Sequence, residues 1–374
     1  MKSIEQIDKN FLSATGETAV EGNFLPVVPG GLFQVEGLPF WEQDKVFCRL
    51  PQAVISRFNE NLRELCWHTA GAKIRFRTDS PVVVVRAKLR NEPAMSHMPD
   101  TGSSGFDLFC GTGRCRHFIG VARSLGAEKQ FSTLLLDVQG RSEEEYPAAA
   151  CIPGTYMREL SLNFPLYNGV ESLEIGLVPG STVLPPAPYA LDKPVLFYGS
   201  SITQGGCASR PGNCYSNLLA KWLDIPTVNY GFSGNAKGEP EMAELIASIP
   251  MSCFVMDYDH NAPNPQHLRE THYPFYRLIR EKWPKLPIIM VTKPDLGGRN
   301  SELRERLSII HANYERGLAE GDKHLFFVNG QDLFGEYCRD CCTVDGCHPN
   351  DLGFFRMAEK LEPTLRRALN TREL

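Results

Sequence analysis

The hydrophobic pattern in the first half of the chain is typical of β-strands. Residues 73–78 alternate charged and apolar, and residues 82–89 begin with a β-branched run and then alternate. Residues 131–138 and 172–178 follow the same two-residue period, which places one face of each strand against a core. Clusters of Gly, Pro, Asn and Asp separate these segments. The pattern predicts an antiparallel β-sandwich or jelly roll.

The second half has a different rhythm, in which continuous apolar runs alternate with amphipathic segments. The apolar runs, typical of strands buried on both faces, are residues 195–198, 227–230, 253–256, 288–291 and 325–328. Apolar positions spaced three and four residues apart predict helices within residues 215–223, 242–249, 303–318 and 354–361. Alternating strands and helices predict a three-layer α/β domain around a parallel sheet.

A proline-rich segment at residues 179–188 separates the two patterns. Prolines lack the backbone donor that a sheet needs and stiffen the chain into an extended form. We therefore predict a β domain at residues 1–190 and an α/β domain at residues 191–374.

Charge and hydropathy narrow the range of partners. The 374 residues carry a formal net charge of -5 and no large cluster of Lys and Arg, so we expect neither nucleic acid nor an anionic membrane as a partner. No segment approaches the ~18 apolar residues that would span a bilayer. Acidic residues interrupt the first ten positions before any apolar run forms, so we predict no secretory leader and a cytoplasmic location.

Four of the twelve cysteines, Cys338, Cys341, Cys342 and Cys347, crowd together near the C-terminus. They could bind a metal ion, or they could belong to a turn that holds small residues. The spacing lacks two matched Cys-x-x-Cys pairs, so we favour the turn and predict reduced thiols and no metal.

The loops that follow the predicted strands carry the groups that acyl transfer needs. Functional residues of parallel sheets gather at the C-terminal ends of strands. There the chain places Ser201, Gly234 and Asn261 in order, and Asp345 and His348 precede the last helix. Each has a structural explanation as a helix cap, a turn or a surface residue. Because all five residues follow successive strands, we favour a functional interpretation, in which they supply a nucleophile, oxyanion donors, a carboxylate and a base.

Residues 195–365 resemble the SGNH, or GDSL-like, hydrolases, whose four blocks carry Ser, Gly, Asn and His in this order, the last within Asp-x-x-His. The phrases at residues 198–205 and 208–212 are similar to a bacterial subgroup that has an N-terminal β-sandwich and includes or lies close to carbohydrate esterases. The resemblance implies the SGNH hydrolase fold with a flavodoxin-like sheet. Ser200 departs from the usual Gly-Asp-Ser of the first block, and Asp259 and Ala262 replace the ends of the usual Gly-x-Asn-Asp.

By this resemblance Ser201 is the nucleophile, His348 is the base and Asp345 orients the imidazole. The backbone N–H groups of Ser201 and Gly234 and the amide of Asn261 form the oxyanion hole. No metal or organic cofactor is required. The implied substrate is a small molecule or glycan that carries short acyl groups, acetyl above all, on a carbohydrate or similar polyol.

Three further features were less decisive in the sequence. Arg210 and His260 lie in loops on the side of the site and are candidates for substrate binding, but Arg210 could equally pair with a carboxylate such as Asp259. The loop at residues 96–104, with His97 among its residues, could form one wall of the site or could be a surface hairpin connection.

Two alternatives to a short-chain esterase remain. A carbohydrate-binding protein with a decayed hydrolase site would not need the complete set of candidate catalytic residues. A lipase or lysophospholipase-like acylhydrolase would need an apolar lid or groove, and the loops around the candidate site contain no such run. The sequence does not indicate an oligomeric state.

Overall fold

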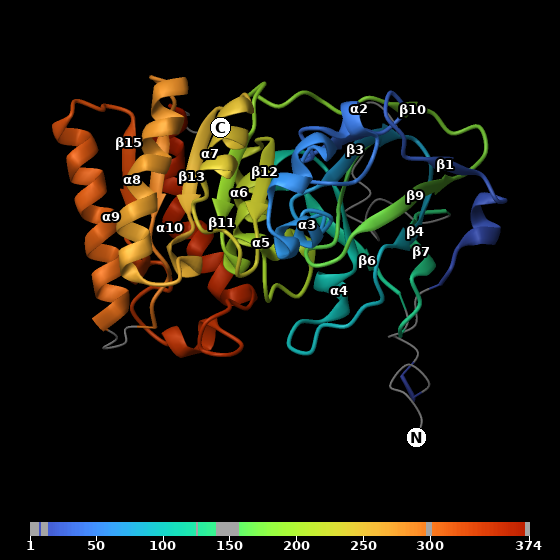
Figure 1. Ribbon diagram of the computed structural model, residues 1–374. Coiled ribbons are helices and arrows are strands. Elements are labelled where there is room, and N and C mark those ends of the chain that lie inside the picture. The colour runs from blue at the N-terminus through green and yellow to red at the C-terminus, as the bar shows by residue number, and fades with distance from the viewer. Residues whose placement is uncertain (1–6, 9–13, 125, 140–156, 297–300, 371–374) are drawn as a thin grey trace.

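The computed structural model describes residues 7–8, 14–124, 126–139, 157–296 and 301–370. Two antiparallel sheets precede a five-stranded parallel sheet with helices on both faces, and Figure 1 shows the two parts side by side. Both parts of the predicted fold class are confirmed. The stretch considered as a leader lies largely outside the described residues, at positions 1–6 and 9–13.

The two antiparallel sheets pack face to face as a sandwich. The four-stranded sheet has the order β1 (Phe24–Pro26), β9 (Val170–Leu177), β4 (Val82–Leu89), β7 (Gln130–Asp137). The second sheet has the order β10 (Val183–Leu184), β3 (Lys73–Thr78), β8 (Arg158–Asn163), β5 (Phe106–Cys110), β6 (His117–Ala122), with β2 (Gln34–Glu36) also paired to β3. Val83 and Val85 pack into the core between the sheets, whereas Val82 and Val84 pack on the outer side against Val20. The two-residue period of the sequence is therefore the inside–outside alternation of these strands.

The parallel sheet has the strand order β12-β11-β13-β14-β15. Its strands are β11 (Val195–Gly199), β12 (Thr227–Gly231), β13 (Cys253–Asp257), β14 (Ile288–Val291) and β15 (Leu325–Val328). The second strand in sequence lies outside the first, which is the flavodoxin-like order 2-1-3-4-5. Ligands of such sheets bind at the carboxyl ends of the strands, on both sides of the first strand.

Helices cover both faces of this sheet. The helix α6 (Tyr215–Leu223) packs with α10 (Asp351–Leu369) on one face, whereas α7 (Pro240–Ser248), α8 (Pro265–Lys282) and α9 (Ser301–Ala319) cover the other. The sequence pattern did not predict α8, which contains Pro274. The short helices are α2 (Trp41–Asp44), α3 (Glu60–Leu65), α4 (Asp100–Ser103) and α5 (Ser201–Gln204). The 3-10 turns are η2 (Glu17–Val20), η3 (Gln52–Arg57), η4 (Gly113–Cys115), η6 (Pro211–Asn213), η7 (Asp259–Asn261), η8 (Gly330–Asp332) and η9 (Arg339–Cys342).

Part of the first half packs against the parallel sheet. Leu50, Phe58 and Leu62 share a hydrophobic core with residues of β12. The buried Arg49 guanidinium donates hydrogen bonds to the carbonyls of Asn229 and Gly231, at 3.1 and 2.5 Å. Burial lowers the pKa of Arg49 to about 10. The division of the chain at residues 190 and 191 stays a prediction, and across that division the two halves share one core.

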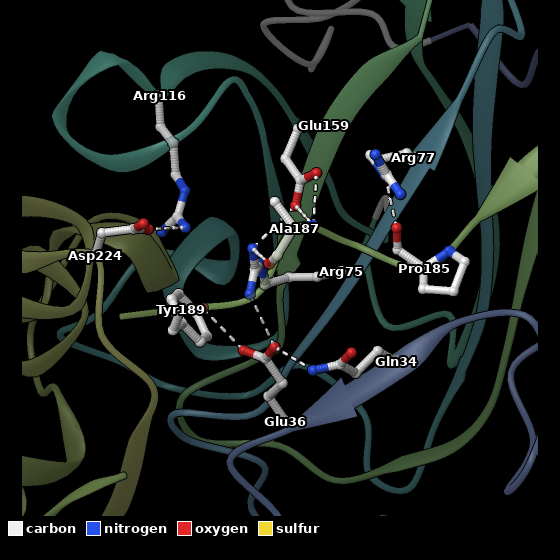
Figure 2. Close-up of polar contacts among 10 residues, drawn as sticks. All are labelled: Gln34, Glu36, Arg75, Arg77, Arg116, Glu159, Pro185, Ala187, Tyr189 and Asp224. Carbon is white, nitrogen blue, oxygen red and sulfur yellow. Dashed lines mark hydrogen bonds and ion pairs between the residues drawn. The ribbon is translucent and has the colours of Figure 1, made fainter. Parts of the chain in front are cut away.

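The proline-rich connection is fixed to the sandwich rather than free. Its strand β10 pairs with β3. Arg77 donates to the carbonyl of Pro185 at 2.6 Å and Arg75 to the carbonyl of Ala187 at 2.8 Å, as Figure 2 shows. The backbone N–H of Ala187 donates in turn to the carboxylate of Glu159 at 3.1 Å. Extended proline-rich chain therefore serves as an edge of the second sheet.

The same network continues to the α/β part of the molecule. Arg75 is ion-paired with Glu36 and Glu159 at 3.2 and 2.9 Å, and its guanidinium stacks on the ring of Tyr189, 3.9 Å from the centroid. Arg116 is ion-paired at 2.6 Å with Asp224, which ends α6 (Figure 2). These contacts fix how the sandwich sits on the parallel-sheet part.

No helix in the described part of the chain is both long and apolar enough to cross a membrane. The cytoplasmic location stays a prediction.

Candidate active site

Ser201 begins α5 immediately after β11. Ser200 is the helix cap, and its hydroxyl accepts a hydrogen bond from the N–H of Ile202 at 3.1 Å. A Cβ atom at Gly199 would lie 2.1 Å from the Thr203 hydroxyl and 2.3 Å from the Asp257 carbonyl, so only glycine allows the helix to turn back this closely. This tight turn places the Ser201 side chain at the carboxyl edge of the sheet.

Ser201, His348 and Asp345 lie in one chain of hydrogen bonds. The Oγ of Ser201 is 2.9 Å from Nε2 of His348, and Nδ1 of His348 is 2.7 Å from Oδ2 of Asp345. The other carboxylate oxygen accepts the backbone N–H groups of Cys347 and His348, at 2.9 and 2.7 Å. The loop before α10 therefore presents a carboxylate and an imidazole together to the serine.

Hydrogen bonding keeps Asp345 ionised. Burial alone would raise the pKa of this carboxyl, but the hydrogen bonds from His348 and Cys347 outweigh burial and lower the pKa to about 2. An ionised Asp345 accepts the proton on Nδ1 of His348, which leaves Nε2 as the acceptor that faces Ser201. This is the tautomer that a general base requires.

A second aspartate lies below the serine turn. Asp257 ends β13, is 4% exposed, and accepts hydrogen bonds from the hydroxyls of Thr203 and Tyr215 at 3.0 and 2.9 Å. Burial raises the pKa of Asp257 to about 8, and the nearby Asp259 adds to the rise. Asp257 is therefore protonated at neutral pH and ties α5 and α6 to β13.

The two other predicted oxyanion residues lie on neighbouring strand ends. Asn261 donates through Nδ2 to the carbonyl of Phe232 at 2.9 Å, and Phe232 donates its N–H to the carbonyl of Gly199 at 2.9 Å. Gly234 has a φ of 68°, in the left-handed region that favours glycine. The structure thus brings the loops of Ser201, Gly234 and Asn261 to one edge of the sheet, and their role as an oxyanion hole stays a prediction.

Three side chains that the sequence analysis did not select hold this edge together. Gln204 accepts the N–H of Ser233 at 2.9 Å and donates to Nδ1 of His68 at 3.1 Å. Burial lowers the pKa of His68 to about 3, so its ring is neutral and can accept that bond. The hydroxyl of Tyr167 donates to the carbonyl of Ser201 at 3.1 Å. His68 and Tyr167 come from the first half, so no pattern near the serine pointed to them.

Arg210 is engaged in a structural ion pair. Its guanidinium lies 2.9 Å from Oδ2 of Asp107 and 4.2 Å from the centroid of the Phe118 ring. The pairing with Asp259 that we considered is wrong, because the partner Asp107 belongs to the sandwich strand β5. Asp259 instead accepts the backbone N–H of Lys293 at 3.1 Å. Arg210 therefore joins the two parts of the molecule.

His260 contacts the loop that carries Asp345 and His348. Its Nε2 lies 3.1 Å from Sγ of Cys347, which sits between Asp345 and His348 in the sequence. Burial, followed by the charges of Lys293 and His348, lowers the pKa of His260 to about 3. A neutral His260 supports the loop, and its role in substrate binding stays a prediction.

The side chains of the four clustered cysteines lie in different surroundings. Cys342 is buried and lies 3.3 Å from a guanidinium nitrogen of Arg356, whereas Cys347 contacts His260. Cys338 and Cys341 are exposed. Within the described ranges, these thiols do not form a group of three ligands at coordinating distance.

The loop at residues 96–104 lies against the candidate site. It connects β4 to β5, which belong to different sheets, so it is not a hairpin connection. Met98 is 3% exposed in the core around Ile202, and the Thr101 hydroxyl donates to the carbonyl of Ser209 at 2.6 Å. The ring of His97 lies edge-on to the ring of His348, with centroids 5.7 Å apart. The first half of the chain therefore supplies a residue beside His348.

Comparisons with known proteins identify the families that the two halves of the chain resemble. Residues 192–366 match the GDSL-like lipase/acylhydrolase family, and residues 31–183 match the N-terminus of SGNH-hydrolase-type esterases. None of the curated proteins compared with the chain matches it.

Several solved structures share the whole arrangement. A putative GDSL-like lipase from Bacteroides ovatus is 27% identical with a TM-score of 0.80, over 94% of this chain and 99% of that one. A salicylyl-acyltransferase from a tetracycline biosynthetic pathway is 17% identical with a TM-score of 0.71, over 93% and 99%. A family two carbohydrate esterase from Clostridium thermocellum, in complex with cellohexaose, is 14% identical with a TM-score of 0.58, over 80% and 93%. The similarity to the salicylyl-acyltransferase and to the carbohydrate esterase is one of fold alone.

Proposed function

Because the chain belongs to the SGNH, or GDSL-like, hydrolase family and is an ester hydrolase, we propose that Ser201, His348 and Asp345 are its catalytic triad. The observation that carries this proposal is the continuous chain from Ser201 Oγ through His348 to Asp345, with distances of 2.9 and 2.7 Å. Each contact joins groups that a serine hydrolase needs: the hydroxyl gives its proton to the imidazole, and the carboxylate orients the imidazole and stabilises its charged form.

The mechanism follows from these contacts. His348 takes the proton of the Ser201 hydroxyl at Nε2 while Oγ attacks the ester carbonyl carbon. Asp345 stabilises the imidazolium through Nδ1–H. His348 then gives its proton to the leaving alcohol, and a water molecule activated by the same nitrogen hydrolyses the acyl-enzyme. Because the pKa of Asp345 is lowered to about 2, its charge is present throughout the neutral range.

The oxyanion would be held by the backbone N–H groups of Ser201 and Gly234 and by the amide of Asn261. The first N–H groups of a helix have no partner in a preceding turn, so the N–H of Ser201 suits this task. Asn261 must turn its amide from the Phe232 carbonyl toward the substrate, or divide its two N–H bonds between them, since one NH₂ group supplies two donors. Loss of one such donor costs about 3–4 kcal/mol in the barrier.

The proposed substrate carries a short acyl group, acetyl above all, on a carbohydrate or similar polyol. Two observations support this choice. Exposed polar side chains, His97 and Asp345, stand beside the base and suit a hydroxylated alcohol better than an aliphatic one. Family two carbohydrate esterases, one of them in complex with cellohexaose, also share the fold.

A panel of substrates tests the proposal. The full chain is assayed on aryl acetate, butyrate and octanoate and on acetylated sugars, with Ser201→Ala as the inactive control. We expect the highest kcat/KM on acetates, and an organophosphate adduct that maps to Ser201. Preference for octanoate would instead favour a lipase-like enzyme. Binding of sugars without turnover of any ester would favour a carbohydrate-binding protein.

A further inference from the structure

Three metal-ligating side chains converge at the mouth of the site. One ligand atom from each of His97, Asp345 and His348 lies within 4.8 Å of the ligand atoms of the other two. His97 and Asp345 are exposed, and His348 is partly buried. Two of these residues belong to the proposed triad, whereas His97 comes from the first half of the chain and has no part in the proton transfer described above.

The ligand set fits a divalent transition-metal ion. Two imidazoles and one carboxylate, with water at the fourth position, are ligands typical of zinc. In a tetrahedral zinc site with bonds of about 2.0–2.1 Å, neighbouring ligand atoms lie about 3.4 Å apart. The ligand atoms lie within 4.8 Å of one another, so the widest separation must close by at most about 1.4 Å, which rotation of the exposed His97 side chain can provide. If Nδ1 of His348 is the ligand, its distance of 2.7 Å from Oδ2 of Asp345 must instead open by less than about 1 Å. We propose that zinc binds between His97, Asp345 and His348 and thereby inhibits the enzyme reversibly.

The position of His97 is fixed by its surroundings rather than by the metal. The loop that carries it is held by buried Met98 and by the bond from Thr101 to the Ser209 carbonyl. The ion pair of Arg116 with Asp224 and that of Asp107 with Arg210 tie the sandwich to the rest of the molecule, the first of them drawn in Figure 2. Because the third ligand is placed in advance, binding requires only side-chain movement.

Inhibition follows from the proton balance of His348. If zinc binds Nδ1, the neutral imidazole carries its one proton on Nε2 instead. A protonated Nε2 cannot accept the proton of Ser201. If zinc instead binds Nε2, it displaces the contact of 2.9 Å with Ser201 Oγ. In both cases the base is lost. This consequence rests on the proposed function, whereas the binding of zinc does not.

Calorimetry measures the binding of zinc separately from the inhibition of the enzyme. Zinc chloride is titrated into the full-length Ser201→Ala variant, which keeps all three ligands but cannot turn over ester. We expect one zinc ion per chain, and a loss of affinity of at least about tenfold when His97→Gln is added. His117→Gln, which removes an exposed histidine on β6, is the matched control and should bind zinc like the parent. Equal affinity of the His97→Gln and His117→Gln variants would overturn the proposal.

A spectroscopic measurement tests whether cysteines bind the metal instead. Cobalt(II) is used in place of zinc, and a thiolate-to-cobalt charge-transfer band would reveal cysteine ligands. We expect no such band at one equivalent. A band that persists in His97→Gln would place the metal at Cys338, Cys341 or their neighbours and would overturn the assignment.

The kinetic readout is the inhibition constant of zinc for ester hydrolysis, taken for each variant relative to its own zinc-free rate. We expect inhibition that EDTA reverses, with an inhibition constant at least about tenfold higher for His97→Gln than for His117→Gln. Zinc binding through His97 without inhibition would overturn the inhibitory role. If no ester were hydrolysed at all, the proposed function would fail while calorimetry would still decide the site.

Discussion

Two aspartates near the carboxyl edge of the parallel sheet, Asp345 and Asp257, have contrasting surroundings. Asp345 occupies the loop before α10 with 38% of its side chain exposed, and its pKa is lowered to about 2. Asp257 ends a central strand, is 4% exposed, and its pKa is raised to about 8. Asp345 accepts three hydrogen bonds and Asp257 accepts two, so both carboxyl groups are hydrogen-bonded although their pKa values move in opposite directions.

The kind of hydrogen-bond donor and the degree of burial explain why the pKa of Asp345 falls while that of Asp257 rises. Asp345 accepts two backbone N–H groups as well as the imidazole, and a carboxylate so bonded stays charged. Asp257 accepts two hydroxyl groups at a position closed to water, where the cost of burying charge is greater than what those bonds return. Only Asp345 can balance an imidazolium, whereas Asp257 suits a neutral structural bridge.

The largest expected effects are those of substitutions in the loop before α10. We expect His348→Ala to lower kcat/KM by about 10⁴–10⁶-fold and Asp345→Ala by about 10²–10⁴-fold, because water can replace part of an orienting carboxylate but not the base. Activity is measured on an aryl acetate with each protein checked for folding.

Asp257→Asn is the matched control on the buried side, and it should keep most of the activity. If Asp257→Asn were as damaging as Asp345→Ala, the division of roles between the two aspartates would be wrong. If Asp345→Ala had no effect, the site would be a Ser–His dyad.

An intermediate effect should be seen in the pH dependence of stability. Asp257 keeps its proton in the folded protein up to about pH 8, but an unfolded chain loses that proton near about pH 3.9. The folded state therefore binds more protons across this window, and the stability that Asp257 contributes falls as pH rises from about 4 to 8. Asp345 has the opposite sign, since its contribution is present above about pH 4 and is lost as pH falls toward 2.

Asp257→Asn removes the first of these dependences. On going from pH 5 to pH 8, we expect the variant to lose about 1–3 kcal/mol less stability than the wild type. Thermal or denaturant unfolding at the two pH values measures the difference, and Asp345→Asn should match the wild type over the same range. Parallel curves for Asp257→Asn and the wild type would show that Asp257 is ionised in the folded protein.

The contrast between local and distant contacts also explains what the sequence could predict. Strands such as Lys73–Thr78 and helices such as Tyr215–Leu223 have the predicted bounds, because their periodicity is written in consecutive residues. The candidates Ser201, Asp345 and His348 were identified for a related reason, since strand ends of a parallel sheet gather at one edge. The helix α8 was missed although Asn264 caps it and Pro265 opens it, and it carries Pro274 in its interior.

Contacts between the two halves of the chain could not be predicted from the sequence. The partner of Arg210 is Asp107 rather than Asp259, and the neighbour of His348 is His97, 251 positions away. No spacing rule relates such residues, because their contact depends on how the sandwich docks on the parallel sheet. The sequence offered the loop at residues 96–104 only as one of two possibilities, and the sheet membership of β4 and β5 excludes the hairpin.

The smallest expected effect concerns Ser200, which precedes Ser201, the proposed nucleophile. Its hydroxyl caps α5, a helix of only four residues. We expect Ser200→Ala to lower stability by about 0.5–2 kcal/mol and Ser200→Gly by only a few tenths, because glycine tolerates the cap position better than alanine. Both variants should keep most of the activity, since the hydroxyl that faces His348 belongs to Ser201. Unfolding curves and aryl acetate kinetics are compared with Ser201→Ala, which should be inactive without the stability change of a lost cap. A Ser200→Ala protein as inactive as Ser201→Ala would mean that the cap, and not only the adjacent hydroxyl, sets the position of the nucleophile.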